Sequence, residues 1–460
     1  MNFLRVRRLH FVGVGGVGMS GLAELLKSIG LTVTGSDMRE SDATERLRAL
    51  GIPVFGQGHR PEHVAGADVV VYSSAVHEDN PEVAAARMAG IPVIKRAEML
   101  AEVLRVKRGI AIAGTHGKTT TTSMTGAILM AANLDPTIIV GGRMCDVGNA
   151  RLGRGDFLVA EADEFDRSFL LLSPVLAVVT NIDLEHLDTY RDLADLKESF
   201  TRFTRSVPFF GAAILGLDDP NVQEIRPLVG RRVITFGLTP QADITVRDLV
   251  IDRNGSRFTA VADLKPLGTV TLSVPGLHNV KNALAALAVS RELEIPFAVA
   301  ARALAAFQGV IRRFERKGER RGVLVVDDYA HHPTEVAATL AAARQAHPER
   351  RIVALFQPHL YSRTRDMAAQ FGAAFLAADV LLVTPVYGSR ETPIEGVTGA
   401  LVADAAIQRG HRSARYVAER NAIVSVLEST LDAGDLLLTM GAGDVLHFGE
   451  EFLAKGEAGR

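Results

Sequence analysis

The fold of this chain is constrained most by a pattern that begins three times along the sequence. A short β-branched run is followed by a polar or glycine-rich turn and then by an Ala/Leu-rich helical stretch. The pattern begins near residue 9, at residue 109 with GIAIAGTHGKTTTTSMTGAILMAA, and near residue 322 with GVLVVDDYAHHPTEVAATLAAARQA. Strands that alternate with helices are typical of α/β proteins with parallel sheets. The three stretches are separate units, not copies of one repeat.

These starts place domain boundaries near residues 107 and 315. We therefore predict an α/β chain of three domains, at 1–107, 108–315 and 316–460. The first and last are expected to be Rossmann-like. The central one is expected to be a P-loop-type ATPase domain with a mostly parallel sheet.

Two segments depart from this pattern. Residues 230–275 contain alternating runs such as DITVRDLVIDRNGSRFTAV, which favour antiparallel hairpins, so we expect a small antiparallel sheet in the central domain. The basic segment GVIRRFERKGERRG (309–322) lies at the second boundary and is a candidate hinge.

Composition excludes several classes of protein. The 460 residues carry a formal net charge of -2, which gives no general attraction to nucleic acid or to an anionic membrane. The single cysteine, Cys145, excludes an internal disulfide and a Cys-type zinc cluster. No apolar run reaches the roughly 18 residues that a membrane span needs. The N-terminus reads as a first strand rather than a signal peptide, so we expect a cytoplasmic protein.

The first glycine-rich turn carries the spelling of a dinucleotide-binding fingerprint. Gly13-x-Gly15-x-x-Gly18 follows an apolar run and precedes a helical stretch. Asp37 lies 19 residues beyond Gly18, where an NAD enzyme would hold a ribose. These residues alone leave NAD binding and the binding of another phosphate equally open.

The second glycine-rich turn, GTHGKTT (114–120), carries more chemical information. Lys118 supplies a fixed positive charge for the β- and γ-phosphates of a nucleotide, and Thr119 places a hydroxyl where Mg²⁺ would bind. Ile112 stands where the usual P-loop has its first glycine. The alternative is a tight strand–helix turn with a capping threonine. Because a lysine is rarely idle at such a helix start, we favour a phosphate site.

Acidic and amide residues follow the next two apolar strands. EADEFD (161–166) follows FLVA, and NIDLEHLD (181–188) follows VLAVVT. Ligands of open α/β sheets bind beyond the carboxyl ends of strands, and carboxylate and imidazole groups are ligands for Mg²⁺ or Mn²⁺. The alternative is a set of solvated loop acids with one surface histidine. The neighbouring lysine and threonine favour the metal.

With these motifs in place, the chain resembles the Mur ligase family along nearly its whole length and in the family's order. GTHGKTT and DDYAHHPTE are highly specific, whereas GVGGVG is not. The motifs that carry the resemblance are GVGGVGMSG (13–21), YSSAV (72–76), GTHGKTTTT (114–122), EADEFDRSF (161–169), TNIDLEHLDTY (180–190), GLHNVKNALAA (276–286), RRFERKG (312–318), DDYAHHPTE (327–335), FQPHLYSRT (356–364) and GAGD (441–444).

The resemblance implies that the first domain binds a UDP-sugar, the central domain ATP and metal, and the last domain the incoming amino acid. It implies a metal held by Thr119, Glu161 and His186, and catalytic roles for Lys118, His186 and Arg363. It implies ATP contacts from Gly114, Thr115, His116, Gly117, Lys118, Thr119, Thr120, His278, Asn279 and Asn282.

The same resemblance implies that the first glycine turn holds the diphosphate of UDP rather than NAD. The residues expected around the UDP-sugar are Gly15, Gly16, Met19, Ser20, Asp37, Ser73 and Ser74. Those expected around the amino acid are Tyr329, His331, His359 and Arg363, with the Arg363 guanidinium on the alanine carboxylate.

Simpler interpretations stay open for some of these side chains. Asn279 and Asn282 can be helix caps, and His331 with His332 can mark a helix N-terminus before Pro333. Arg312 and Arg313, expected at the junction of the central and C-terminal domains, can be ordinary linker charges.

The sequence also departs from the family in places. The family often has Ser at Phe165 and Arg at Leu360, so Arg363 carries more of the expected carboxylate binding. Some relatives use a carbamylated lysine near the position of Ser199–Phe200. Lys197 falls short of that position, so we do not expect carbamylation here.

The reaction implied is ATP-dependent amide formation with UDP-N-acetylmuramate, L-alanine and ATP as substrates and Mg²⁺ or Mn²⁺ as cofactor. The sequence does not identify the general base; His331 and His359 are candidates. Three alternatives remain: an NAD-dependent oxidoreductase, a non-enzymatic P-loop switch, and a recycling ligase that attaches a ready-made tripeptide. FQPHLYSRT and HHPTE favour single-alanine ligation. We expect no nucleic-acid or membrane partner, and a monomer or weak homodimer.

Overall fold

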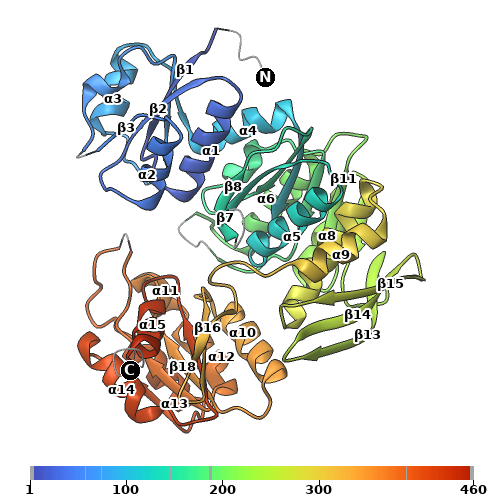
Figure 1. Cartoon of the computed structure of the whole chain (residues 1–460), viewed down its shortest axis with the longest axis vertical. Helices are drawn as coiled ribbons and strands as arrows, with labels where there is room; N and C mark the ends of the chain where they lie inside the picture. The colour runs from blue at the N-terminus through green and yellow to red at the C-terminus, as the bar shows by residue number, and fades with distance from the viewer. Residues whose placement is uncertain are drawn as a thin grey trace. The chain divides into compact units, whose positions relative to one another are not determined.

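The computed structural model describes most of the chain (Figure 1). The described residues are 5–56, 58–73, 75–144, 148–185, 189–389 and 391–455. They divide into two compact units. The first unit comprises Met1–Arg247, Thr259–Val270 and Lys281–Ala305, and the second comprises Asp248–Phe258, Thr271–Val280 and Ala306–Arg460.

The N-terminal part of the first unit is a five-stranded parallel sheet of order β3-β2-β1-β4-β5 (Figure 1, blue). The strand order reverses direction between β1 and β4, so the loop after β1 opens at a topological switch point, where α/β sheets bind ligands. The elements are β1 (Arg8–Val12), α1 (Val17–Ser28), β2 (Thr32–Ser36), α2 (Asp42–Ala49), β3 (Val54–Phe55), η1 (Pro61–Val64), β4 (Val69–Tyr72), α3 (Pro81–Met88), β5 (Val93–Lys95) and α4 (Arg96–Val106).

Helices cover both faces of this sheet, as its nearly continuous apolar strands require. Leu26 of α1 and Leu100 of α4 pack in one apolar cluster with Phe11 of β1. Val83 of α3 packs with Tyr72 of β4 in a cluster on the opposite face. The first prediction, a Rossmann-like N-terminal domain, is therefore confirmed.

The central sheet has ten strands, in the order β15-β14-β13-β12-β11-β10-β6-β9-β7-β8. β6 lies between β9 and β10 and is parallel to both, so the loops after these three strands emerge at one edge. The strands are β6 (Arg108–Ala113), β7 (Thr137–Met144), β8 (Gly148–Arg151), β9 (Phe157–Glu161), β10 (Leu176–Val179), β11 (Ala212–Gly216), β12 (Val233–Phe236), β13 (Ile244–Asp252), β14 (Gly255–Ala262) and β15 (Lys265–Leu272).

The alternating runs after residue 230 continue the central sheet as β13, β14 and β15. On one face of the sheet, Phe200 and Phe203 of α6 pack with the buried strand residue Val179. The helices of this stretch are α5 (Lys118–Ala131), η2 (Ser168–Leu171), α6 (Leu193–Arg205), α7 (Pro220–Ile225), η3 (Arg226–Leu228), α8 (Leu277–Glu292) and α9 (Phe297–Ala306).

Within the first unit, α1 of the N-terminal part packs closely against β8 of the central sheet. A Cβ atom on Gly21 would lie 2.6 Å from the Cβ of Ala150, so only glycine permits this approach. The packing brings the glycine loop before α1 close to the edge of the central sheet where β7 and β9 end.

The second unit contains a six-stranded sheet of order β16-β17-β21-β18-β19-β20, parallel except for β16. Leu340 of α10 and Phe371 of α12 cover one face, and Leu427 of α14 and Phe452 of α15 cover the other. Its elements are β16 (Glu315–Arg320), β17 (Val323–Asp328), α10 (Pro333–Ala346), β18 (Ile352–Phe356), α11 (Tyr361–Asp366), α12 (Ala368–Ala374), η4 (Phe375–Ala377), β19 (Val380–Val383), α13 (Ala400–Gln408), β20 (Ala414–Tyr416), η5 (Arg420–Ala422), α14 (Ile423–Thr430), β21 (Leu436–Met440) and α15 (Leu446–Ala454).

None of the described helices is both long enough and apolar enough to span a bilayer.

Candidate active site

The second glycine turn forms a tight loop between β6 and α5. Gly114 and Gly117 have φ angles of +125° and +82°, which side-chain-bearing residues rarely adopt. A Cβ atom on Gly114 would lie 2.0 Å from Thr180 Oγ1, and one on Gly117 would lie 2.5 Å from Asn282 Oδ1. The loop therefore needs both glycines for its conformation and for space. Its backbone N–H groups and the N-terminus of α5 provide the geometry of an anion site.

Lys118 is the first residue of α5, and its ammonium lies inside this loop. Lys118 Nζ donates to Glu164 Oε2 at 2.8 Å and to the carbonyl of Gly114 at 2.8 Å. Burial raises the pKa of Glu164 to about 7, although the ammonium opposes that rise. Burial lowers the pKa of Lys118, but the carboxylates around it outweigh burial and raise the pKa overall. The ammonium thus stays charged and is held at the place where nucleotide phosphates need it.

Thr119 and Glu161 meet as the sequence predicts. Thr119 Oγ1 donates to Glu161 Oε2 at 2.9 Å, and the backbone N–H of Gly141 donates to the same oxygen at 2.7 Å. A hydroxyl and a carboxylate beside a phosphate loop are hard oxygen donors, the ligand set that Mg²⁺ prefers. The residues present therefore fit a divalent cation. The third expected ligand, His186, lies outside the described residues.

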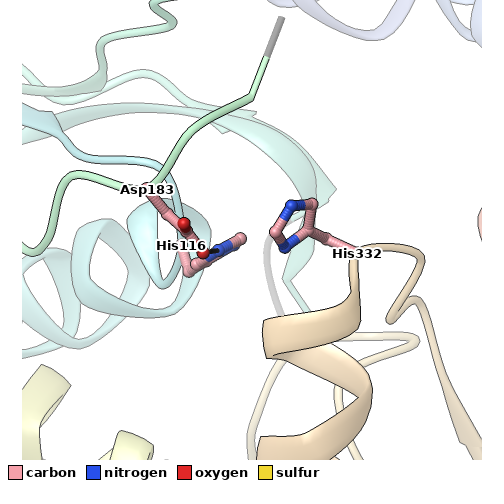
Figure 2. Close-up of side chains that lie close together, drawn as sticks. All are labelled: His116, Asp183 and His332. Atoms are coloured by element: carbon pink, nitrogen blue, oxygen red, sulfur yellow. Dashed lines mark hydrogen bonds and ion pairs between the residues drawn. The ribbon is translucent and has the colours of Figure 1, made fainter. Parts of the chain in front are cut away.

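His116 is anchored to the loop after β10. Its Nε2 lies 3.2 Å from Asp183 Oδ2 (Figure 2), and its backbone N–H donates to Asn181 Oδ1 at 2.9 Å. Thr115 Oγ1 accepts from the backbone N–H of Asp183 at 2.9 Å. The loops after β6 and β10 are thus joined by side chains, as expected for neighbouring parallel strands.

The residues expected near the nucleoside take different places. Asn282 accepts a hydrogen bond from Thr121 Oγ1 at 3.2 Å and lies against Gly117, so it contacts the phosphate loop from α8. Asn279 donates its side-chain N–H to the carbonyl of Pro275 at 2.7 Å, which differs from a helix cap, where the side chain accepts a backbone N–H. His278 lies against Gly276.

The first glycine turn is held by acceptors at the end of β2. The backbone N–H groups of Gly13 and Val14 donate to the carbonyl of Ser36, at 2.9 and 3.0 Å. The backbone N–H of Gly15 donates to Asp37 Oδ2 at 2.8 Å. Asp37 therefore contacts the loop itself. Ser74, predicted beside this loop, lies outside the described residues.

A cavity of about 240 Å³ joins this loop to the acidic edge of the central sheet. Among the predicted residues it is lined by Gly16, Met19, Ser73 and Glu161. The structure thus brings the first glycine turn and the carboxylate that binds Thr119 to the walls of one cavity. Ser20 is buried in the first turn of α1, and its side chain is not among those that line the cavity.

Among the other residues that line this cavity are two charged ones that the sequence analysis did not select. Arg96, the first residue of α4, lies with its guanidinium 2.7 Å from the position that a Cβ of Gly18 would take. Asp163 lies in the quoted motif EADEFD. Arg96 comes directly after β5. Residues that follow a parallel strand are candidates for ligand contact, and this position was the signal that the sequence offered. A guanidinium in this wall suits an anionic ligand.

In the second unit, the predicted aromatic and imidazole side chains form one cluster. The ring of His331 lies 5.3 Å from that of Tyr329 and 5.6 Å from that of His359, centroid to centroid. Arg363 Nη1 lies 3.3 Å from His359 Nδ1. Tyr387, which was not predicted, stacks on His359 at 6.0 Å. All four residues expected around the amino acid are therefore neighbours.

The neighbouring histidines His331 and His332 have different environments. The backbone N–H of Thr334 donates to His332 Nδ1 at 3.3 Å, so His332 (Figure 2) caps the N-terminus of α10. His331 Nδ1 lies 3.0 Å from the carbonyl oxygen of Tyr329, and its backbone N–H donates to Glu335. The capping role thus applies to His332, while His331 belongs to the aromatic cluster.

Arg312 and Arg313 are not free linker charges. Arg312 donates to Asp327 Oδ2 at 3.1 Å and to the carbonyls of Gly441 and Gly443. Arg313 pairs with Glu335 at 3.3 Å. Both guanidinium groups lie over the Tyr329 ring, at 5.0 and 5.3 Å. They tie the end of the linker to the aromatic cluster.

Comparison with known proteins agrees with the order of these sites. Residues 8–108 match the model described as "Mur ligase family, catalytic domain". Residues 112–290 match "Mur ligase middle domain", and residues 312–443 match "Mur ligase, glutamate ligase domain". Together the three models span most of the chain.

Full-length relatives carry one name. The UDP-N-acetylmuramate--L-alanine ligase of Geobacter sp. (strain M21) is 52% identical over 457 residues, covering 99% of both chains. That of Salinibacter ruber is 53% identical and covers 98% of this chain and 95% of its own. The crystal structure of a UDP-N-acetylmuramate-alanine ligase from Thermotoga maritima superposes with a TM-score of 0.82 at 31% identity, covering 98% of this chain and 100% of its own. A murein peptide ligase from Psychrobacter arcticus 273-4 gives a TM-score of 0.70 at 26% identity, covering 97% and 98%.

Proposed function

Because the chain belongs to the Mur ligase family, we propose that it joins L-alanine to the lactyl carboxylate of UDP-N-acetylmuramate and converts ATP to ADP and phosphate in the same reaction. The observation that carries this proposal is the shared cavity. Its walls include Gly16 of the first glycine turn and Glu161, whose carboxylate binds Thr119 of the phosphate loop. A diphosphate-sugar held by the first turn has its far end directed to the nucleotide site.

The proposed reaction has two steps. An oxygen of the lactyl carboxylate attacks the γ-phosphorus of ATP, and the bond to the β-phosphate oxygen breaks to release ADP. The amine of L-alanine then attacks the carbonyl carbon of the acyl phosphate, and inorganic phosphate leaves with the C–O bond electrons. The amine loses a proton in this step. Phosphorylation is needed because a free carboxylate is a poor acylating agent.

Charge neutralisation is the main task of the central site in the first step, because two anions must meet. Lys118 provides a fixed positive charge on the phosphate side. Thr119 and Glu161, with His186, are proposed to hold Mg²⁺ or Mn²⁺, which supplies further positive charge to the phosphates when bound. The loop glycines, His116, Thr115 and Thr120 are proposed to contact ATP, with Asn282, Asn279 and His278 toward the nucleoside.

The two substrate sites are assigned by their chemistry. The first glycine turn, with Met19, Ser20, Ser73 and Ser74, is proposed to bind the UDP-sugar, and Asp37 to order the turn. The cluster of Tyr329, His331, His359 and Arg363 is proposed to bind L-alanine, since a planar guanidinium matches a carboxylate. We further propose domain boundaries near residues 107 and 315, a cytoplasmic location, and a monomer or weak homodimer.

Phosphate release by the purified chain tests this proposal. Release is expected only when UDP-N-acetylmuramate, L-alanine, ATP and Mg²⁺ are all present, with a product heavier than the sugar nucleotide by one alanyl residue. Phosphate release without the UDP-sugar would favour a P-loop switch, and absorbance at the nicotinamide band would favour an oxidoreductase. Either result would overturn the proposal.

The choice of acceptor distinguishes the L-alanine ligase from the recycling ligase. A recycling ligase would prefer the tripeptide L-alanyl-γ-D-glutamyl-meso-diaminopimelate over L-alanine, so both acceptors are compared at equal concentration. We expect L-alanine to be used and the tripeptide to be poor. In the same assay Arg363→Ala is expected to raise the KM for alanine, and an unchanged KM would remove Arg363 from the alanine site.

A further inference from the structure

A buried carboxylate in the N-terminal part of the first unit gathers three histidines. Glu82, near the start of α3, is fully buried. Its carboxylate lies 3.2 Å from His10 Nε2, 3.3 Å from His59 Nδ1 and 2.5 Å from His63 Nδ1. The residues come from β1, from the loop after β3, from η1 and from α3, so tertiary folding alone brings them together.

Two further donors complete the shell of this carboxylate. Ser36 Oγ donates to Glu82 Oε2 at 2.5 Å, and the backbone N–H of Arg60 donates to Oε1 at 3.2 Å. Burial raises the pKa of Glu82, but hydrogen bonds from His10, Ser36 and His63 outweigh it and hold the pKa at about 2. Glu82 therefore stays ionised throughout the physiological range.

Among the described residues, the ionisable groups that pair with Glu82 are imidazole rings. No ammonium or guanidinium group of the described residues pairs with this carboxylate. The side chains of Arg60 and of Glu62 on η1 are exposed, and that of Arg8 on β1 is exposed as well. The remaining neighbours are neutral: Thr34 of β2 bonds His10 Nδ1 at 2.8 Å, and Phe55 of β3 stacks on His63 at 4.3 Å. A buried carboxylate is costly without a positive partner, so a positive charge next to Glu82 can come only from these rings among the described residues.

This cluster is linked directly to the first glycine turn. Ser36, which donates its hydroxyl to Glu82, accepts the backbone N–H groups of Gly13 and Val14 on its carbonyl. The next residue, Asp37, accepts the backbone N–H of Gly15. Ser36 and Asp37, at the end of β2, therefore both contact the first glycine turn, and Ser36 also contacts the Glu82 cluster.

We propose that Glu82 with His10, His59 and His63 forms a proton-linked positioning site beneath the first glycine turn, so that binding of a diphosphate in the turn is coupled to proton uptake by the histidines. The proposal rests on the proposed function, since it takes the turn as the diphosphate site. The histidines are positioning residues, because they act through Ser36 and through their charge.

The direction of the coupling follows from electrostatics. With a proton on its histidines the cluster is neutral or positive, and without one it carries the single negative charge of Glu82. Histidine is the side chain whose charge ordinarily changes between about pH 5 and 8. A negative charge beneath the turn repels the diphosphate, so affinity falls as the pH rises through this range.

The test is a calorimetric titration of UDP-N-acetylmuramate into the full-length chain without ATP, between about pH 6 and 8.5. This ligand keeps a constant charge there, because its carboxylate ordinarily titrates near pH 4 and its diphosphate is a diester. Each titration is run at every pH in two phosphate-free buffers of different ionisation enthalpy, because the difference between the observed heats reveals proton uptake and inorganic phosphate would compete for the turn. We expect the Kd to rise about three- to tenfold across this range, with net proton uptake on binding.

Variants separate charge from hydrogen bonding. His63→Gln keeps an amide donor for Glu82 but cannot titrate, so proton uptake and the slope of Kd with pH are both expected to fall. His59→Gln repeats the test at a second ring in case His63→Gln does not fold, as thermal unfolding will show. The control is His447→Gln, which removes a ring from an exposed pair with Glu450 in the other unit and is expected to change neither quantity.

The possible results distinguish failure of the proton coupling from failure of the proposed function. A Kd that does not vary with pH, or proton uptake that persists unchanged in both folded variants, would overturn the coupling while leaving the binding site intact. Absence of any binding by the wild-type chain at every pH would instead contradict the proposed function. No histidine of the described residues lines the cavity, but Glu161 and Asp163 do, so only the part of the uptake that is lost in the histidine variants is assigned to the cluster.

Discussion

The two glycine turns of the first unit have the same local architecture but different chemistry. Each joins a central parallel strand to a helix, β1 to α1 and β6 to α5. In the turn after β1, the backbone N–H groups of Gly13, Val14 and Gly15 donate to Ser36 and Asp37, and these bonds hold the turn in place. The turn after β6 also contains the ammonium of Lys118, with Thr119 on a carboxylate.

This difference distinguishes a turn that binds a phosphate group from a turn at which a phosphate group reacts. A glycine turn that has Arg96 beside it but no lysine of its own suits a diphosphate whose charge does not change during the reaction. A turn with a lysine and oxygen ligands for a metal suits phosphates that gain charge during transfer. A glycine motif by itself therefore indicates an anion, and the side chains around it indicate what happens to that anion.

Removing the ammonium of the second turn is expected to have the largest effect. Lys118→Ala should lower the rate of phosphate release at least about 10³-fold, since a preorganised charge on the phosphates is lost. The fold should survive, because a raised pKa lets Glu164 take up a proton when its partner is gone. Binding of UDP-N-acetylmuramate, measured by calorimetry, should stay within about twofold.

A matched control is Lys197→Ala, which removes a lysine of α6 that pairs with the exposed carboxylate of Glu224. It should retain wild-type turnover. If Lys118→Ala turned over normally, the second turn would not be the ATP site, and the contrast between the turns would fail.

Chelation of divalent cations is expected to come next in size. With excess EDTA, phosphate release should fall about 10²- to 10³-fold, because the oxygen donors of Thr119 and Glu161 then hold no cation. Thr119 belongs to the second turn, so the affinity of the first turn for the UDP-sugar should not change. Calorimetry with and without EDTA checks this, and a metal-dependent affinity for the UDP-sugar would contradict it.

Gly117→Ala probes the space inside the second turn. The added methyl group meets Asn282 Oδ1 at 2.5 Å and φ is +82°, so we expect kcat/KM for ATP to fall about 10²-fold. Gly230→Ala is the control for backbone strain alone, because φ is +61° there and no atom lies within 4 Å. It should cost about 1 kcal/mol in unfolding free energy and leave kcat/KM unchanged. If Gly117→Ala were as active as Gly230→Ala, neither the crowding nor the φ angle at Gly117 would be needed for the ATP site.

Asp37→Ala is expected to have the smallest effect and to be confined to the first turn. Loss of the acceptor for Gly15 should raise the KM for UDP-N-acetylmuramate about tenfold, the size of one lost charge-assisted hydrogen bond. The KM for ATP and kcat should not change. Asp42→Ala, at the exposed start of α2, serves as control. A fall in kcat rather than a rise in KM would place Asp37 in the reaction itself.

Much of this organisation was predictable because its signals are local. Strand–turn–helix spacing predicted the α/β fold and both glycine turns, and the neighbours of Lys118 in sequence predicted an anion site. The meeting of Thr119 with Glu161 also followed, because parallel strands end at one edge of a sheet. The resemblance supplied the grouping of His331, His359 and Arg363, which pattern alone did not indicate.

Other contacts had little or no signal in the sequence. Arg96 reaches the cavity wall because α4 begins where β5 ends, and the sequence did not indicate that Asp37 accepts the backbone N–H of Gly15. Glu164 stood in a quoted motif with no assigned role, and its pairing with Lys118 depends on how β9 ends beside β6.

The sequence by itself determined the periodicities, the glycines that tight turns require and the types of side chain at strand ends, since these depend on neighbours within a few residues. The tertiary structure alone decided that His10, Ser36, His59, His63 and Glu82 share one buried site. Those residues span 72 positions, and no spacing rule connects them. They meet because β1 pairs with β2 and β4, and because α3 and η1 pack on the same face.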